Sequence, residues 1–183
     1  MKCLYFLIVV VLMFSLVSAV LNIGTENNNL PKISLVTPVS SNQYYGGMWN
    51  KTTGGFQTID LITTEVYSQI TDLYPEGKTK GFTIANGNMT TLVGGYYQAS
   101  FAGSINKGSI SEYGIKLFVN SIGEENCYSH FDVIATMGGT PSFSCFVNLT
   151  TGDIVNIKID DHVNPVNDPV IENFNLNLVR IGN

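Results

Sequence analysis

The sequence predicts an all-β protein, an antiparallel β-sandwich of two sheets with about ten strands. Charged residues make up only 13% of the chain, so Glu, Lys and Arg are too few to cover the solvent faces of several helices. The ten Phe, nine Tyr and abundant β-branched residues favour strands, and eighteen Gly supply turns between them. Short runs that alternate between apolar and polar residues recur from residue 44 to residue 181.

The chain begins with an apolar segment, residues 1–19, that we expect to be a secretory signal peptide. Lys2 precedes an uncharged apolar run over 4–14, and small residues end at Ala19, where a signal peptidase would cut. The alternative is a retained membrane anchor, because the uncharged stretch 3–22 is just long enough to span a bilayer. Either way, we expect a secreted or cell-surface protein.

Residues 20–43 are expected to form a separate N-terminal segment. Polar and turn-forming residues at 24–31 and 38–42 flank a short apolar run at 33–36. A flexible tether explains this composition. The alternative is that 33–36 form an assembly strand, which pairs with the sheet edge of a neighbouring subunit.

Residues 44–183 form the predicted β domain. The expected strands cover residues 44–49, 58–62, 65–70, 81–85, 89–93, 95–104, 113–120, 131–135, 143–149, 155–159 and 174–181. The expected turns lie at 63–64, 74–77, 86–87, 138–139 and 152–153; Asn86–Gly87 is a favoured hairpin sequence. Two facing layers bury the alternating apolar faces, and closing them as a jelly roll protects the sheet edges.

Several of these segments resemble the complement-head and tumour-necrosis-factor-like jelly roll, including its phage and environmental fibre-type versions. The matching segments are 82–87 (FTIANG), 94–104 (GGYYQASFAGS), 113–120 (YGIKLFVN), 149–157 (LTTGDIVNI) and 174–181 (FNLNLVRI). The resemblance covers about residues 44–183 and implies a homotrimeric recognition or structural module. The aromatic-rich strand that often fills the trimer axis of that family is not evident in this sequence.

Two cysteines are expected to form a disulfide. Cys3 lies in the signal peptide, which leaves Cys127 and Cys145 as an even pair in an exported chain. The alternative is two buried free thiols. Candidate glycosylation sites, if the host glycosylates exported proteins, are Asn50, Asn88 and Asn148, each in an Asn-x-Ser/Thr sequence.

The charge and the catalytic motifs exclude several classes of function. The net charge is −5 and the basic residues are scattered singly, which argues against nucleic-acid binding. The chain has two His and no His-x-x-x-His, Gly-x-Ser-x-Gly or Cys-x-x-Cys pattern. We therefore expect a non-enzymatic protein; a secreted hydrolase is the distant alternative.

Two weaker patterns suggest ligands. Asp160, Asp161 and Asp168 beside His162 could bind calcium through oxygen atoms, or they could form a solvated acidic loop; no other cofactor is expected. Trp49 lies in a Gly-rich region and could stack on a sugar, or it could anchor its strand in the core or at a subunit contact.

The sequence as a whole predicts an exported structural or recognition module that self-associates and presents polar loops for binding. The alternative is a carbohydrate-binding module on a cell surface or a viral fibre tip. We expect a homo-oligomer, with a protein or glycan ligand, and contact with a membrane only if the N-terminal segment is retained.

Overall fold

The computed structural model describes residues 43–50, 57–75, 78–106, 110–134, 137–163 and 168–183. These residues contain twelve strands and no helix, so the all-β prediction is confirmed. The strands are β1 (Tyr45–Asn50), β2 (Gln57–Thr58), β3 (Ser68–Gln69), β4 (Leu73–Pro75), β5 (Phe82–Ala85), β6 (Asn88–Thr91), β7 (Gly95–Asn106), β8 (Ser111–Val119), β9 (Ile122–Val133), β10 (Ser142–Leu149), β11 (Ile154–Asp161) and β12 (Val170–Gly182). Within the described residues there is no helix that could cross a bilayer.

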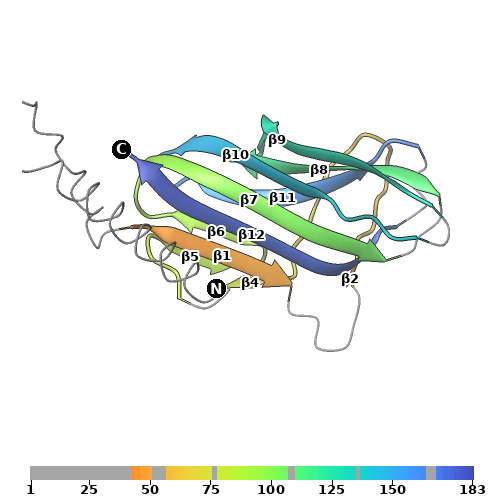
Figure 1. Cartoon of the computed structure of the whole chain (residues 1–183), viewed down its shortest axis with the longest axis horizontal. Coiled ribbons are helices and arrows are strands. Elements are labelled where there is room, and N and C mark those ends of the chain that lie inside the picture. Colours follow the sequence, from red (N-terminus) through yellow and green to blue (C-terminus); the bar gives the residue numbers. More distant parts are fainter. Residues whose placement is uncertain (1–42, 51–56, 76–77, 107–109, 135–136, 164–167) are drawn as a thin grey trace, which may run out of the picture. The chain divides into compact units, whose positions relative to one another are not determined.

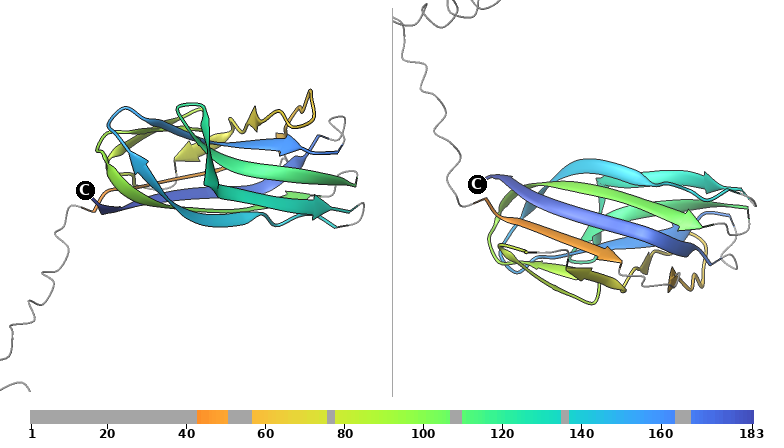
Figure 2. Two further views of the ribbon diagram at one scale, coloured as in Figure 1. Left: turned by 90° about the horizontal axis from the view of Figure 1, so that it is seen from above. Right: turned by 60° about the horizontal axis from the view of Figure 1, so that its bottom comes forward.

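The strands form two antiparallel sheets that pack face to face (Figure 1). Sheet A has the order β10-β7-β12-β1-β4, with β2 beside β12, and sheet B has the order β5-β6-β11-β8-β9, with β3 beside β11. The view from above in Figure 2 shows the two layers edge on. This arrangement confirms the predicted two-sheet jelly-roll sandwich.

The core lies between the sheets and is built by the predicted alternation. On β7, Tyr97, Ala99 and Phe101 are buried, whereas the residues between them are exposed. The ring of Phe101 contacts those of Phe143 on β10 and Phe174 on β12, each with its centroid 5.1 Å away. Aromatic pairs at this separation add to the stability gained by apolar burial.

Two of the predicted turns have the backbone that their sequences require. Asn86 and Gly87 join β5 to β6 with φ angles of 51° and 70°, the positive values of a type I′ hairpin turn. Gly152 has a φ of 97° in the turn between β10 and β11. Glycine adopts this conformation without the steric cost that a Cβ would bring.

The region between β1 and β5 differs from the expectation. The predicted turn at 74–77 is wrong in its first half, because Tyr74 and Pro75 belong to β4, which pairs with β1. Proline is tolerated there because β4 is the edge strand of sheet A. The structure does not describe residues 76–77.

The two strands expected at 58–62 and 65–70 are reduced to β2 and β3, of two residues each. The chain passes here from sheet A, which contains β2, to sheet B, which contains β3. Ile59 and Leu61 are buried as the pattern indicates, but their amides donate to Pro169 O and Asp168 Oδ1 rather than to a neighbouring strand. In this segment, the alternation of apolar and polar residues therefore predicted correctly which side chains are buried, but not whether the backbone pairs in a sheet.

The strand expected at 131–135 is longer and begins earlier, as β9. Its first residues, Ile122–Asn126, are mostly polar, so the apolar–polar alternation that predicts strands is absent there. β9 is an edge strand of sheet B, and β10 is the edge strand of sheet A opposite β4. The disulfide Cys127–Cys145 joins these two edges, with a Cα–Cα distance of 5.4 Å, so the predicted pairing is confirmed.

Candidate functional site

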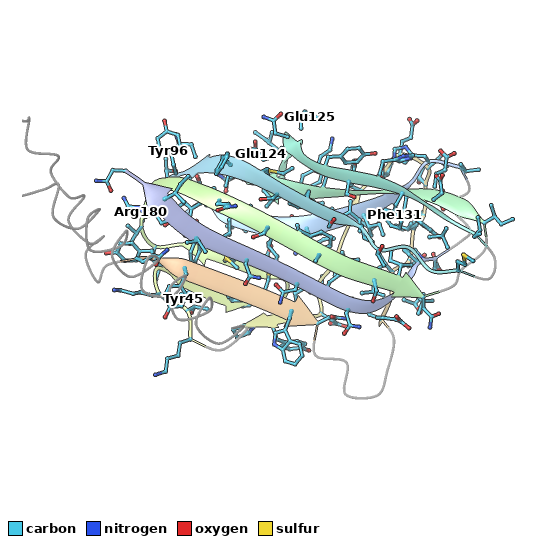
Figure 3. All side chains as sticks on the ribbon, in the orientation of Figure 1. Tyr45, Tyr96, Glu124, Glu125, Phe131 and Arg180 are labelled. Atoms are coloured by element: carbon cyan, nitrogen blue, oxygen red, sulfur yellow. A yellow bond between two sulfur atoms is a disulfide. The ribbon has the colours of Figure 1, made fainter. Side chains whose placement is uncertain are left out.

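The outward surface of sheet A is organised into rows by the register of its strands. The first row is Phe146, Gln98, Val179 and Tyr45; the second is Ser144, Ser100, Asn177 and Gly47; the third is Ser142, Ala102, Asn175, Trp49 and Tyr74. We call the surface formed by these three rows the uncharged face, because none of its side chains carries a charge. Figure 3 labels Tyr45 on it, near the end of the sheet where the chain terminates.

The uncharged face combines exposed aromatic side chains with small polar ones. Phe146 is 66% exposed and Trp49 is 40% exposed, and Tyr45 and Tyr74 are exposed as well. The row between them consists of Ser, Asn and Gly, whose side chains are short or absent. The face therefore has raised aromatic groups at its borders and a lower band across its middle.

Two hollows open on this face. One, of about 330 Å³, is lined by Tyr45, Gly47, Asn177 and Val179, and Lys78 also lines it. The other, of about 360 Å³, is lined by Trp49, Asn50, Ala102, Gly103, Ser104, Asn173, Phe174 and Asn175. Trp49 thus points away from the core, so it does not anchor β1 there; the structure places it beside amide and hydroxyl groups.

The outward surface of sheet B is different, because it carries charged side chains. Lys116 on β8 forms an ion pair with Glu125 on β9 at 2.9 Å, and its ammonium lies over the rings of Tyr67 and Tyr128. The ammonium of Lys158 on β11 lies 4.4 Å from the ring centroid of Phe118. The two sheets therefore present chemically distinct surfaces.

The three aspartates considered for calcium do not share one orientation. Asp160 and Asp161 are consecutive on β11, so their side chains point to opposite faces of sheet B. Asp161 accepts hydrogen bonds from Ser111 Oγ at 2.6 Å and from Val163 N at 2.7 Å. Asp168 accepts one from Leu61 N at 2.9 Å. Asp161 and Asp168 thus each accept hydrogen bonds from other parts of the chain. Calcium binding stays a prediction.

Burial raises the pKa of Tyr113 and of one of these aspartates, Asp160. Desolvation, followed by the charges of Asp161 and Asp168, raises the pKa of Tyr113 to about 12. Desolvation also raises the pKa of Asp160, against the lowering effect of His162. Asp160 is therefore a buried carboxyl that the fold does not fully compensate.

No protein-family model and no curated protein sequence matches the chain. Several solved structures, by contrast, match the fold of the chain. Eiger TNF from S. frugiperda superposes with a TM-score of 0.61 at 11% identity, over 78% of this chain and 94% of that one. Murine APRIL gives 0.53 at 10% identity, over 76% and 99%. The globular domain of zebrafish complement 1qA protein gives 0.52 at 15% identity, over 75% and 95%.

The chain therefore has the C1q/TNF-like jelly-roll fold. The predicted resemblance is confirmed at the level of the fold, which is what identities this low establish. The C1q/TNF-like domain occupies the β-rich part of the chain from β1 to β12.

The three candidate glycosylation sites differ in access on the C1q/TNF-like domain. Asn50 is buried, and its amide donates to Glu172 O at 2.9 Å and accepts from Phe174 N at 2.6 Å. Asn88 is half-buried and bonded to the side chains of Gln69 and Asn156. Asn148 is exposed on β10. Of the three, Asn148 alone offers an amide that a glycan could reach without breaking these bonds.

One group of residues on the C1q/TNF-like domain was missed by sequence reasoning. The ligand atoms of Glu112, His130 and Asp132 all lie within 4.8 Å of one another on the outward surface of sheet B. His130 and Asp132 are two apart on β9, so their side chains share a face, which was a visible signal. Glu112 is eighteen positions before His130, and only the β8–β9 register brings it opposite Asp132.

Proposed function

We propose that this chain is an exported, non-enzymatic recognition module that self-associates through the uncharged face of sheet A, as a trimer. The observation that carries the proposal is the contrast between the two sheets. The central part of a protein interface is depleted in charged residues and enriched in aromatic ones. The uncharged face has this composition, whereas the outward surface of sheet B does not.

Identical chains that associate through one face are expected to form a closed, symmetric ring of subunits. Copies that meet head to tail around a rotation axis bury the same surface in every subunit and leave no free contact. The resemblance to complement-head and tumour-necrosis-factor-like domains implies three copies. Sheet B would then face away from the axis and remain open to a ligand.

Export is supported by the disulfide between β9 and β10, since such bonds persist in oxidising compartments. The predicted signal peptide, residues 1–19, agrees with it. Residues 1–42 lie outside the described residues, so the tether and the assembly strand expected within 20–43 and the membrane anchor all stay predictions.

The experiment compares two substitutions of exposed apolar residues on different sheets. Phe146→Lys places a charge on the uncharged face, whereas Ile122→Lys places one on β9, where Ile122 is 71% exposed. We expect the wild type and Ile122→Lys to elute as trimers in size-exclusion chromatography with light scattering, and Phe146→Lys to shift to monomers. A wild type that is monomeric at micromolar concentration, or a Phe146→Lys variant that stays trimeric, would contradict the proposal.

A second candidate function is glycan binding beside Trp49. A half-exposed indole next to a hollow of about 360 Å³ that is lined by asparagine and serine side chains offers an apolar plane and hydrogen-bonding groups together. Binding pockets commonly combine these two features. This function requires that Trp49, near the β4 border of the uncharged face, stays outside the subunit contact. We then expect Trp49→Ala to abolish binding on a glycan array without changing the oligomeric state. If Trp49→Ala instead dissociates the trimer, the indole is a subunit contact and this second function is wrong.

A further inference from the structure

The chain has only two histidines, and the fold brings them together on the outward surface of sheet B. The rings of His130 on β9 and His162, just after β11, lie 5.2 Å apart between centroids in an edge-to-face arrangement. They are thirty-two residues apart in the sequence. The strand between them is β8, which pairs with both β9 and β11.

Gly114 on β8 makes room for this meeting. It pairs with His130 on one side and with Asp160 on the other. A Cβ at this position would lie 2.3 Å from Asp160 Oδ1 and 2.8 Å from His162 Nε2. The absence of a side chain at Gly114 therefore leaves room for the Asp160 carboxylate and the His162 imidazole, and the His162 ring in turn contacts that of His130.

Carboxylates surround the two rings. Glu112 Oε2 lies 3.7 Å from His130 Nε2, and the nearest ligand atom of Asp132 is within 4.8 Å of both. The backbone of His162 is fixed beside Glu112, because His162 N donates to Glu112 O at 2.8 Å. Two ligand atoms bound to one Zn²⁺ at about 2.0–2.2 Å are themselves about 3.5 Å apart, so these separations need little adjustment.

Asp160 lies on the other side of Gly114 from His130 and is not one of the exposed ligands. Its side chain is 2% exposed, and its Oδ1 lies 3.6 Å from His162 Nε2. Hydrogen bonds with the backbone of Gly114, with its own backbone and with the side chain of Tyr67 act on this carboxyl, as does the charge of Lys116. The groups that act on Asp160 therefore all belong to the chain itself.

We propose that Glu112, His130 and Asp132 form a site for a divalent transition-metal ion of the Zn²⁺ type, with the ring of His162 packed against that of His130. Imidazole nitrogens combined with carboxylate oxygens suit such an ion, whereas calcium prefers oxygen ligands alone. Nε2 of His162 lies 3.2 Å from the hydroxyl oxygen of Tyr128 and 3.6 Å from Asp160 Oδ1, so His162 packs beside His130 and is not one of the three ligands.

The site lies on sheet B, so trimer formation through the uncharged face would leave it accessible. It requires neither the trimer nor a glycan, and it can be tested independently of both. None of the three proposed ligands is an aspartate that the sequence suggested for calcium.

The test is calorimetric titration of the full chain, without a histidine tag, with Zn²⁺ and separately with Ca²⁺. We expect one Zn²⁺ per chain and no comparable Ca²⁺ binding. His130→Ala and Glu112→Gln, both at exposed positions, should each weaken Zn²⁺ binding about tenfold or more. Glu124→Gln, which removes one acidic charge elsewhere on β9, is the matched control and should bind as the wild type does.

A second readout is the visible absorption of Co²⁺ added in place of Zn²⁺. Ligand-field bands should appear with the wild type and disappear with His130→Ala, while circular dichroism confirms that each variant is folded. The proposal is overturned if the wild type binds no Zn²⁺, if Ca²⁺ binds as tightly, or if Glu124→Gln weakens binding as much as Glu112→Gln does.

Discussion

At the scale of single residues, the turn between β10 and β11 shows a local sequence signal that the structure bears out. A turn was predicted at 152–153, and an Asp in a turn commonly accepts hydrogen bonds from nearby backbone; Asp153 Oδ2 accepts one from Thr150 N at 2.7 Å. Its other oxygen, Oδ1, accepts from Asn120 Nδ2 at 2.7 Å, a partner thirty-three residues away that the sequence could not identify. The turn thus ties the β8–β9 connection to β11.

These bonds predict how the turn responds to pH. The hydrogen bond from the Thr150 amide, with help from Asn120, lowers the pKa of Asp153. A carboxyl whose pKa is lower in the folded state stabilises the fold above its unfolded pKa, and the contribution is lost as the pH falls through the folded value. We expect Asp153→Asn to cost about 1 kcal/mol at pH 7 and much less at pH 2. Urea unfolding at both pH values measures this; an equal cost at both would refute it.

At the scale of elements, the long strands could be predicted and the short ones could not. β7, β10 and β12 bury one face and leave the other at least partly exposed, and β8 and β11 show a similar alternation in sequence although both of their faces are largely covered, so a period of two was visible in these strands. β2, β3 and β4 are two or three residues long, too short for any period, and their pairing is decided by where the chain crosses between sheets. An alternating sequence shows which side chains are buried. A segment that crosses from one sheet to the other can bury its side chains in the same pattern as a strand, so the sequence does not distinguish the two.

The difference between local and long-range information also explains which candidate sites could be predicted from the sequence. Trp49 and the paired cysteines were visible as single unusual residues in a chain with one Trp and three Cys. The cluster around Gly114 was not, because it requires the register of three strands: Glu112 opposite Asp132, and His130 and Asp160 on either side of a glycine. No spacing along the chain encodes that arrangement.

At the scale of the whole molecule, the two sheets are held together by the shared core and by one covalent link. The main contacts between neighbouring strands run within each sheet, and the Cys127–Cys145 bond connects the sheets at the edge formed by β9 and β10. Elsewhere along that edge, the contact between the strands rests on non-covalent packing. The bond therefore restrains the opening of the sandwich on the side away from β4 and β5.

This position predicts a whole-molecule effect of reduction. Closing a loop of eighteen residues lowers the entropy of the unfolded chain, which is worth about 3 kcal/mol of stability. The remaining core is large enough to fold, so the double variant Cys127→Ala/Cys145→Ala should fold into the same sandwich with a lower unfolding free energy. Amide exchange should rise first in β9 and β10, while β7 and β12 at the centre of sheet A stay protected. Uniform loss of protection in all strands, or no loss of stability, would show that the bond does not restrain this edge.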